Sequence, residues 1–146
     1  MLGRSWVAVS SRRMRAPLAL SLVAIATACS TGLDIESATG VWGLQTVNGE
    51  TLPVVLSDDG NTVVSISGAI FVIRIETCIL SATYFSTVGG TPQQPEDIGL
   101  TCTWNQNGTD VSFDFGDPET NVAGTIEGGS ITVTNLAGFV FVYRRV

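Results

Sequence analysis

The stretch Thr109-Asp-Val-Ser-Phe-Asp-Phe115 alternates between polar and apolar side chains from Asp110 onward. In an extended strand, Val111, Phe113 and Phe115 therefore share one face, and the acidic and hydroxyl side chains share the other. The same period of two recurs in three further segments, Cys78–Tyr84, Leu100–Trp104 and Ile131–Thr134. This pattern predicts antiparallel strands that each bury one face.

Short turn signals separate these segments. They are Asn48-Gly49, Asp59-Gly60, Ser67-Gly68, Gly89-Gly90, Asn107-Gly108, Gly128-Gly129 and Ala137-Gly138. Tight turns make strands that are consecutive in the sequence neighbours in space, and closing a long twisted sheet removes its exposed edges. No helical spacing occurs beyond residue 28. The chain is therefore predicted to be all-β, an up-and-down antiparallel β-barrel of roughly 8–10 short strands, with a β-sandwich as the alternative.

The composition excludes several kinds of chemistry. The 146 residues include no His, and all seven cationic side chains are arginines. Without His there can be no Ser-His-Asp triad and no His-containing zinc site. Without Lys there can be no Schiff base and no P-loop lysine. We therefore expect a protein that is not an enzyme, with no catalytic residue, cofactor or metal.

The N-terminal segment has the features of an export signal. Arg4, Arg12, Arg13 and Arg15 precede an apolar run, Pro17–Ala28, that ends in small residues. This order is typical of a signal peptide, and the run is shorter than the ~20 residues of a transmembrane helix. Residues 1–28 are predicted to be a signal peptide, with either Met1 or Met14 as its start.

The residue that follows this signal is Cys29, directly after Ala26-Thr27-Ala28. The pattern resembles the lipobox of bacterial lipoproteins, which implies that Cys29 is lipidated and anchors the chain to the cell envelope. Ser30 after the cysteine favours the outer membrane, with the domain facing the periplasm or the cell surface. Residues 29–38 would then form a tether and residues 39–146 the barrel domain. Ordinary signal cleavage that leaves Cys29 as a free thiol is the alternative.

Removal of residues 1–28 leaves three arginines and all 13 acidic residues, a net charge of −10. Such a chain repels phosphate backbones, so nucleic acid is excluded as a partner. With Cys29 lipidated, Cys78 and Cys102 form an even pair in an oxidising compartment. We expect a disulfide between them, with a two-thiol metal site as the alternative.

The two ends of the domain resemble a known family. Gly40-Val41-Trp42 opens the first predicted strand, and the last runs from Gly138 to Arg144-Arg145-Val146. This looks like the lipocalin pattern, and residues 38–146 resemble small bacterial lipocalin-like lipoproteins. The resemblance implies that Gly40 and Trp42 belong to the closed end of the barrel and that an arginine packs across Trp42 there. Arg145 is in phase with Phe139, Phe141 and Tyr143, so it is the expected partner. The alternative is that both terminal arginines are simply solvated.

The resemblance also implies a function, the binding of a small hydrophobic ligand in the barrel. Strand parity assigns seven residues to the binding site: Ile70, Val72, Leu80, Tyr84, Trp104, Phe113 and Phe141. The same residues could instead fill the core, because an eight-stranded barrel is only just wide enough for side chains or one small ligand. The chain would then be a structural or interaction module that docks an envelope protein. In a related version of this alternative, the chain resembles META-type lipoproteins. It lacks their Gly-Cys-Asn motif.

Overall fold

The computed structural model describes residues 36–146. The predicted signal peptide (1–28), the lipidation site Cys29 and the tether up to residue 35 lie outside this range. Within it the chain forms eleven strands and no helix. Accordingly, no helix in the described part of the chain is long and apolar enough to cross a membrane.

The strands are β1 (Gly40–Val47), β2 (Glu50–Thr51), β3 (Val54–Asp58), β4 (Thr62–Ile73), β5 (Thr77–Val88), β6 (Thr91–Pro92), β7 (Glu96–Asn107), β8 (Asp110–Asp114), β9 (Val122–Glu127), β10 (Ser130–Thr134) and β11 (Val140–Arg145). Most turns between them fall at the predicted dipeptides. In the turn between β1 and β2, for example, both Asn48 and Gly49 have positive φ, as this tight connection requires.

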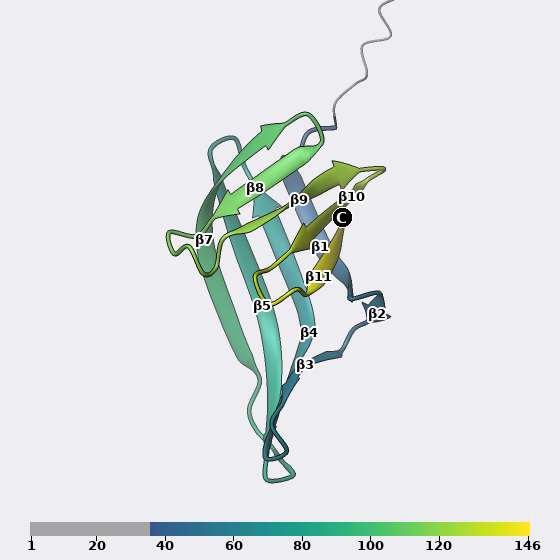
Figure 1. Cartoon of the computed structure of the whole chain (residues 1–146), viewed down its shortest axis with the longest axis vertical. Coiled ribbons are helices and arrows are strands. Elements are labelled where there is room, and N and C mark those ends of the chain that lie inside the picture. Colours follow the sequence, from purple (N-terminus) through teal and green to yellow (C-terminus); the bar gives the residue numbers. More distant parts are fainter. Residues whose placement is uncertain (1–35) are drawn as a thin grey trace, which may run out of the picture. The chain divides into compact units, whose positions relative to one another are not determined.

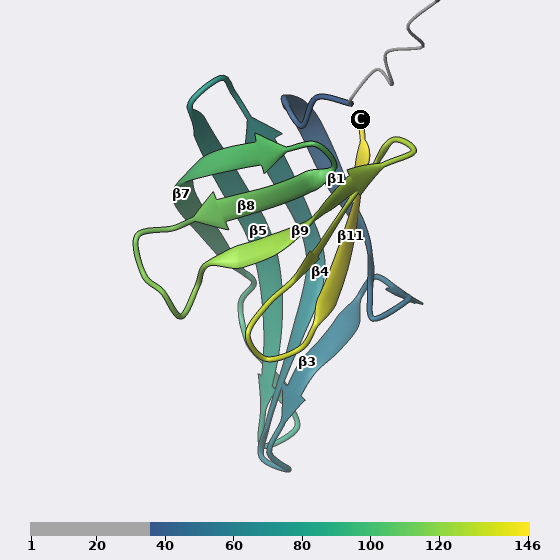
Figure 2. The same cartoon turned by 45° about the horizontal axis from the view of Figure 1, so that its top comes forward.

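Eight of these strands close into a ring, in the order β1, β4, β5, β7, β8, β9, β10 and β11, with every neighbouring pair antiparallel. The ring closes because β1 pairs with β4 on one side and with β11 on the other (Figures 1 and 2). β2, β3 and β6 add short pairings outside the ring. The predicted all-β, up-and-down antiparallel barrel is thus confirmed.

Three of the strands are longer than predicted. β4, β5 and β7 have twelve residues each. Ser67-Gly68, predicted to be a turn, lies inside β4, where the register with β5 shifts between Ile66 and Gly68. A glycine inside a strand often marks such a bulge, which inserts one residue without ending the strand.

The bulge also decides which residues of β4 face inward. Beyond it, Ala69, Phe71 and Ile73 are buried, whereas Ile70 is 50% exposed and Val72 is partly exposed. The prediction that Ile70 and Val72 line the interior is therefore wrong. Residues 69–75 are apolar on both faces except for Arg74, so alternation alone does not distinguish the inner face from the outer one.

Side chains fill the barrel at the end where β1 begins. Trp42, Phe71, Phe113, Ile126 and Ile131 are all at most 1% exposed there. The rings of Phe71 and Phe113 lie 4.5 Å apart between centroids. Aromatic and β-branched side chains from facing strands thus form a solid core in this part of the barrel.

Candidate functional site

Farther along the barrel, away from Trp42, side chains no longer fill the interior. A cavity of about 620 Å³ lies there and opens to solvent. Phe71 lies between this cavity and the solid core, since its ring contacts Phe113 as well as Phe115 and Tyr143, which also line the cavity. The other lining residues on strands are Ile66, Ala69, Leu80, Ala82, Tyr84, Leu100, Val122, Val133 and Phe141. This cavity is the candidate ligand pocket.

Two loops form the rim of the pocket. The loop between β8 and β9 contributes Glu119 and Thr120, and the loop between β10 and β11 contributes Asn135, Leu136 and Ala137. Three of the four strands that these loops join, β9, β10 and β11, also contribute residues to the pocket wall. The rim is therefore built at the end of β11 opposite to Arg145.

Hydrogen bonds within each loop hold the rim in shape. Asn121 Oδ1 accepts from the Phe115 amide at 2.9 Å, and the Asp117 carbonyl accepts from both the amide and the hydroxyl of Thr120 at 2.9 Å. In the second loop, Asn135 Oδ1 accepts from the Phe139 amide at 2.9 Å. These bonds make the pocket largely preformed, as is usual for ligand sites.

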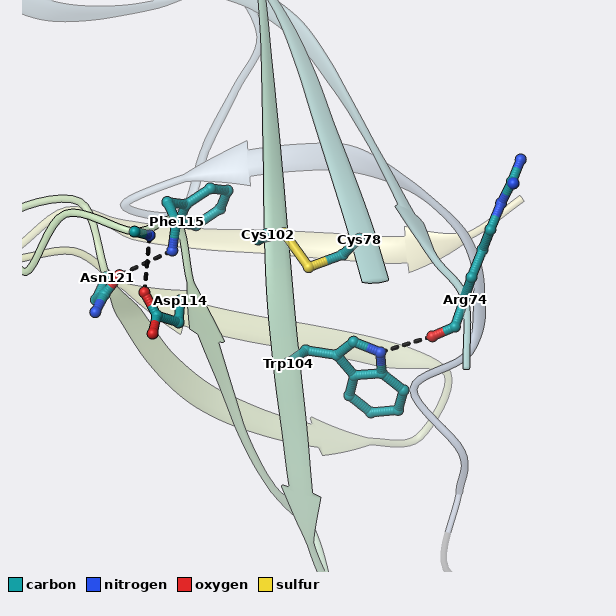
Figure 3. The surroundings of a disulfide bond; sticks show 8 residues. Arg74, Cys78, Cys102, Trp104, Asp114, Phe115 and Asn121 are labelled. Carbon is teal, nitrogen blue, oxygen red and sulfur yellow. Dashed lines mark hydrogen bonds between the residues drawn. A yellow bond between two sulfur atoms is a disulfide. The ribbon is translucent and has the colours of Figure 1, made fainter. Parts of the chain in front are cut away.

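Three of the seven residues predicted to bind a ligand line this pocket, namely Leu80, Tyr84 and Phe141. Phe113 is inside the barrel but belongs to the solid core beneath the cavity. Trp104 is half-buried, and its Nε1 donates to the carbonyl of Arg74 at 2.6 Å, outside the pocket (Figure 3). Ile70 and Val72 are on the outer face of β4 and do not reach it.

Sequence reasoning missed several residues that do line the pocket. Tyr143, Leu100 and Phe115 are in phase with Phe141, Cys102 and Phe113, so strand parity could have identified them. Ala69 and Ala82 face each other across β4 and β5, and their small side chains leave room for the cavity. The rim residues had no periodic signal, because loops do not alternate.

The predicted disulfide is present. Cys78 in β5 and Cys102 in β7 are directly paired across the sheet with a Cα–Cα distance of 4.9 Å, and both are buried. Figure 3 shows this bridge between Trp104 on one side and Phe115 on the other. It therefore joins two of the strands that form the pocket wall.

At the end of β11 that lies opposite to the pocket rim, Arg145 lies over Trp42, with its guanidinium carbon 4.4 Å from the ring centroid. Gly40 leaves space for this contact, because a Cβ there would lie 2.6 Å from Arg145 Nη1. A guanidinium on an indole face contributes about 0.5–2 kcal/mol, depending on its desolvation. The contact joins the first and last strands of the ring.

Residues 36–39, here called the N-terminal strap, are bound to this closed end. Arg145 donates to the carbonyls of Thr39 and Ser37 at 2.9 and 2.8 Å, and its Nη2 lies 3.8 Å from a carboxylate oxygen of Glu36. The Gln106 side chain bonds the Ala38 amide and the Glu36 carbonyl. The N-terminal strap thus lies across the closed end and is hydrogen-bonded to β7 and β11.

In the described segment 36–146, the ionisable groups that line the pocket are Glu119, Tyr84 and Tyr143. Burial raises the pKa of the Tyr84 hydroxyl. Burial, and to a lesser extent the nearby Tyr84, raises the pKa of Tyr143 well above its usual range. Both hydroxyls are therefore neutral at physiological pH, and this set of groups offers hydrogen bonds within an apolar cavity.

Comparison with known proteins finds no family model, no curated protein and no solved structure that matches this chain.

Proposed function

We propose that this protein binds a small, mainly apolar molecule in the barrel and catalyses no reaction on it. The observation that carries the proposal is the preformed cavity of about 620 Å³ with its mostly apolar lining. Ligand sites commonly measure about 300–1,000 Å³ and combine an apolar wall with a few polar groups. The absence of His and Lys from the sequence supports a binding role over a catalytic one.

Substitution of Ala82 by leucine tests this function. Ala82 is buried in the pocket wall, so a leucine side chain there occupies ligand space. We expect the mature protein to bind the neutral dye N-phenyl-1-naphthylamine with increased dye fluorescence, and the Ala82→Leu variant to bind it at least about tenfold more weakly. Fluorescence titration measures both affinities.

The matched control is Ser81→Leu, which adds the same side chain one residue earlier, on the exposed outer face of β5. It should bind the dye as the unaltered protein does. Circular dichroism verifies that both variants keep the β fold. Absence of dye binding to the unaltered protein, or equal binding by the Ala82→Leu variant, would contradict the proposal.

We also propose that the chain is exported and attached to the envelope through a lipid on Cys29. The lipobox-like Ala26-Thr27-Ala28-Cys29 supports this assignment, and the buried disulfide suits an oxidising compartment. The closed eight-stranded barrel and the contact between Arg145 and Trp42 support the likeness to lipocalin-like lipoproteins.

Substitution of Cys29 by alanine should release the protein from the membrane fraction into the soluble fraction, because the residue that carries the lipid is lost. Fractionation of cells followed by immunoblotting measures the distribution. Ser30→Ala, which alters the next residue and keeps the thiol, should leave the protein in the membrane fraction. A Cys29→Ala protein that still sediments with membranes would show that the anchor is elsewhere.

A role as an interaction module is the second candidate, and one surface favours it. Val41, Val72 and Ile79 lie side by side on the outer faces of β1, β4 and β5, next to Ile70. Val41, Ile70 and Ile79 are each at least 40% exposed. Exposed apolar groups of this kind are typical of docking surfaces. If the dye does not bind, this face becomes the leading candidate for the functional surface.

A further inference from the structure

Tyr143 lines the pocket, and its hydroxyl has no hydrogen-bond partner in the part of the chain that the structure describes. The residue is 4% exposed and lines the cavity. Within residues 36–146 its hydroxyl makes no hydrogen bond, although no fully enclosed side-chain nitrogen or oxygen there lacks a partner. The hydroxyl is therefore reached from the cavity, and a ligand in the cavity can supply the hydrogen bond that is missing.

Tyr84 supplies a second hydroxyl to the same space. It is half-buried in β5, across the barrel from Tyr143 in β11, and it lines the same cavity. Both hydroxyl-bearing side chains therefore line one cavity. A neutral phenol can donate a hydrogen bond to a ligand oxygen.

The surroundings of the pocket do not favour an anionic ligand. Among residues 36–146, no cationic side chain lines the cavity, and the one carboxylate that does, Glu119, is at the rim. The three arginines among residues 36–146 are elsewhere: Arg74 and Arg144 are exposed, and Arg145 is at the closed end. A carboxylate that entered would lose its hydration without gaining a counter-ion, which is strongly unfavourable.

We propose that Tyr143 and Tyr84 form a polar subsite that selects neutral ligands carrying a hydrogen-bond acceptor, such as a ketone or an ester, over carboxylates of the same size. This inference rests on the proposed function and specifies the ligand class for the same pocket. The apolar walls hold the body of the ligand, and the tyrosine hydroxyls donate to its oxygen.

Three ten-carbon compounds test the selection at neutral pH. Butyrophenone carries a ketone, butylbenzene carries no oxygen, and 4-phenylbutanoate carries a carboxylate. Each competes with N-phenyl-1-naphthylamine for the mature protein, and the loss of dye fluorescence gives its affinity. We expect butyrophenone to bind about 3- to 10-fold more tightly than butylbenzene, the usual gain from one hydrogen bond, and 4-phenylbutanoate to bind most weakly.

The variant Tyr143→Phe removes the hydroxyl and keeps the ring. It should lose about 3- to 10-fold in affinity for butyrophenone while its affinity for butylbenzene stays within about twofold. Tyr84→Phe, at a less buried position, gives a second measurement if the first variant folds poorly. Ser81→Ala, on the outer face, is the control and should change neither affinity.

The outcomes separate the two proposals. If the dye and all three compounds fail to bind, the proposed function itself is wrong. If butylbenzene binds as tightly as butyrophenone, or if both tyrosine variants keep the preference for the ketone, the pocket binds ligands but the tyrosine subsite is wrong. Tight binding of 4-phenylbutanoate would likewise overturn the selection against carboxylates.

Discussion

Replacement of Gly124 by alanine should destabilise the barrel by about 3 kcal/mol or more, one of the largest effects expected for a single methyl group in this protein. Gly124 is in β9, paired with Val133 of β10 and Val111 of β8. A Cβ at this position would overlap the Thr132 carbonyl and would lie 2.8 Å from the Val133 Cα. These are backbone atoms, so no side-chain rotation can relieve the overlap, and β9 and β10 would have to separate.

Urea denaturation followed by circular dichroism measures this loss of stability. Gly99→Ala is the matched control, because Gly99 is also inside a strand and a Cβ there meets no atom within 4 Å. That variant should be neutral or up to about 1 kcal/mol more stable, since alanine restricts the unfolded chain. Equal urea midpoints for the two variants would show that β9 and β10 do not approach so closely.

Loss of the disulfide should cause the second large decrease in stability. Cys78 and Cys102 are 24 residues apart in the sequence. Removal of a cross-link that closes a loop of this length lowers the free energy of unfolding by about 3–4 kcal/mol, because the unfolded chain gains entropy. The double variant Cys78→Ala/Cys102→Ala should therefore unfold at a clearly lower urea concentration. Because the bridge joins two strands of the pocket wall, dye affinity should fall as well.

Reduction provides an independent comparison for this prediction. Dithiothreitol should destabilise the unaltered protein by about the same 3–4 kcal/mol and should leave the double variant unchanged. A destabilisation below about 1 kcal/mol in both experiments would mean that the bridge contributes little to folding.

The period of two in the sequence predicted most of the barrel because it reports directly which side chains share a face. Val111 and Phe113 alternate with polar residues, and both are buried as expected. The same reasoning placed Cys78 and Cys102 inside, where they are bonded. In β8, and in β7 around Cys102, only one face is bulky and apolar, so the direction of the interior is unambiguous.

Strand alternation does not identify the interior where both faces of a strand are apolar. Residues 69–75 are apolar on both faces except for Arg74, and the bulge at Ser67 shifts the register just before them. Alternation therefore predicts the wrong face for Ile70. Tyr143 was in phase with Phe141, but its position along β11, between the solid core and the cavity, depends on how the ring closes. The rim residues Glu119 and Asn135 come together only in three dimensions.

The N-terminal strap has a consequence for how the barrel would face the membrane. The strap is fixed to the closed end by Arg145 and Gln106, whereas the pocket rim lies at the other end of β11. With the lipid on Cys29, as proposed, the segment from Cys29 to Glu36 can reach at most about 25 Å. Such a short linker would keep the closed end of the barrel near the bilayer surface. The pocket would then open away from the membrane, so that ligands would enter from the aqueous side.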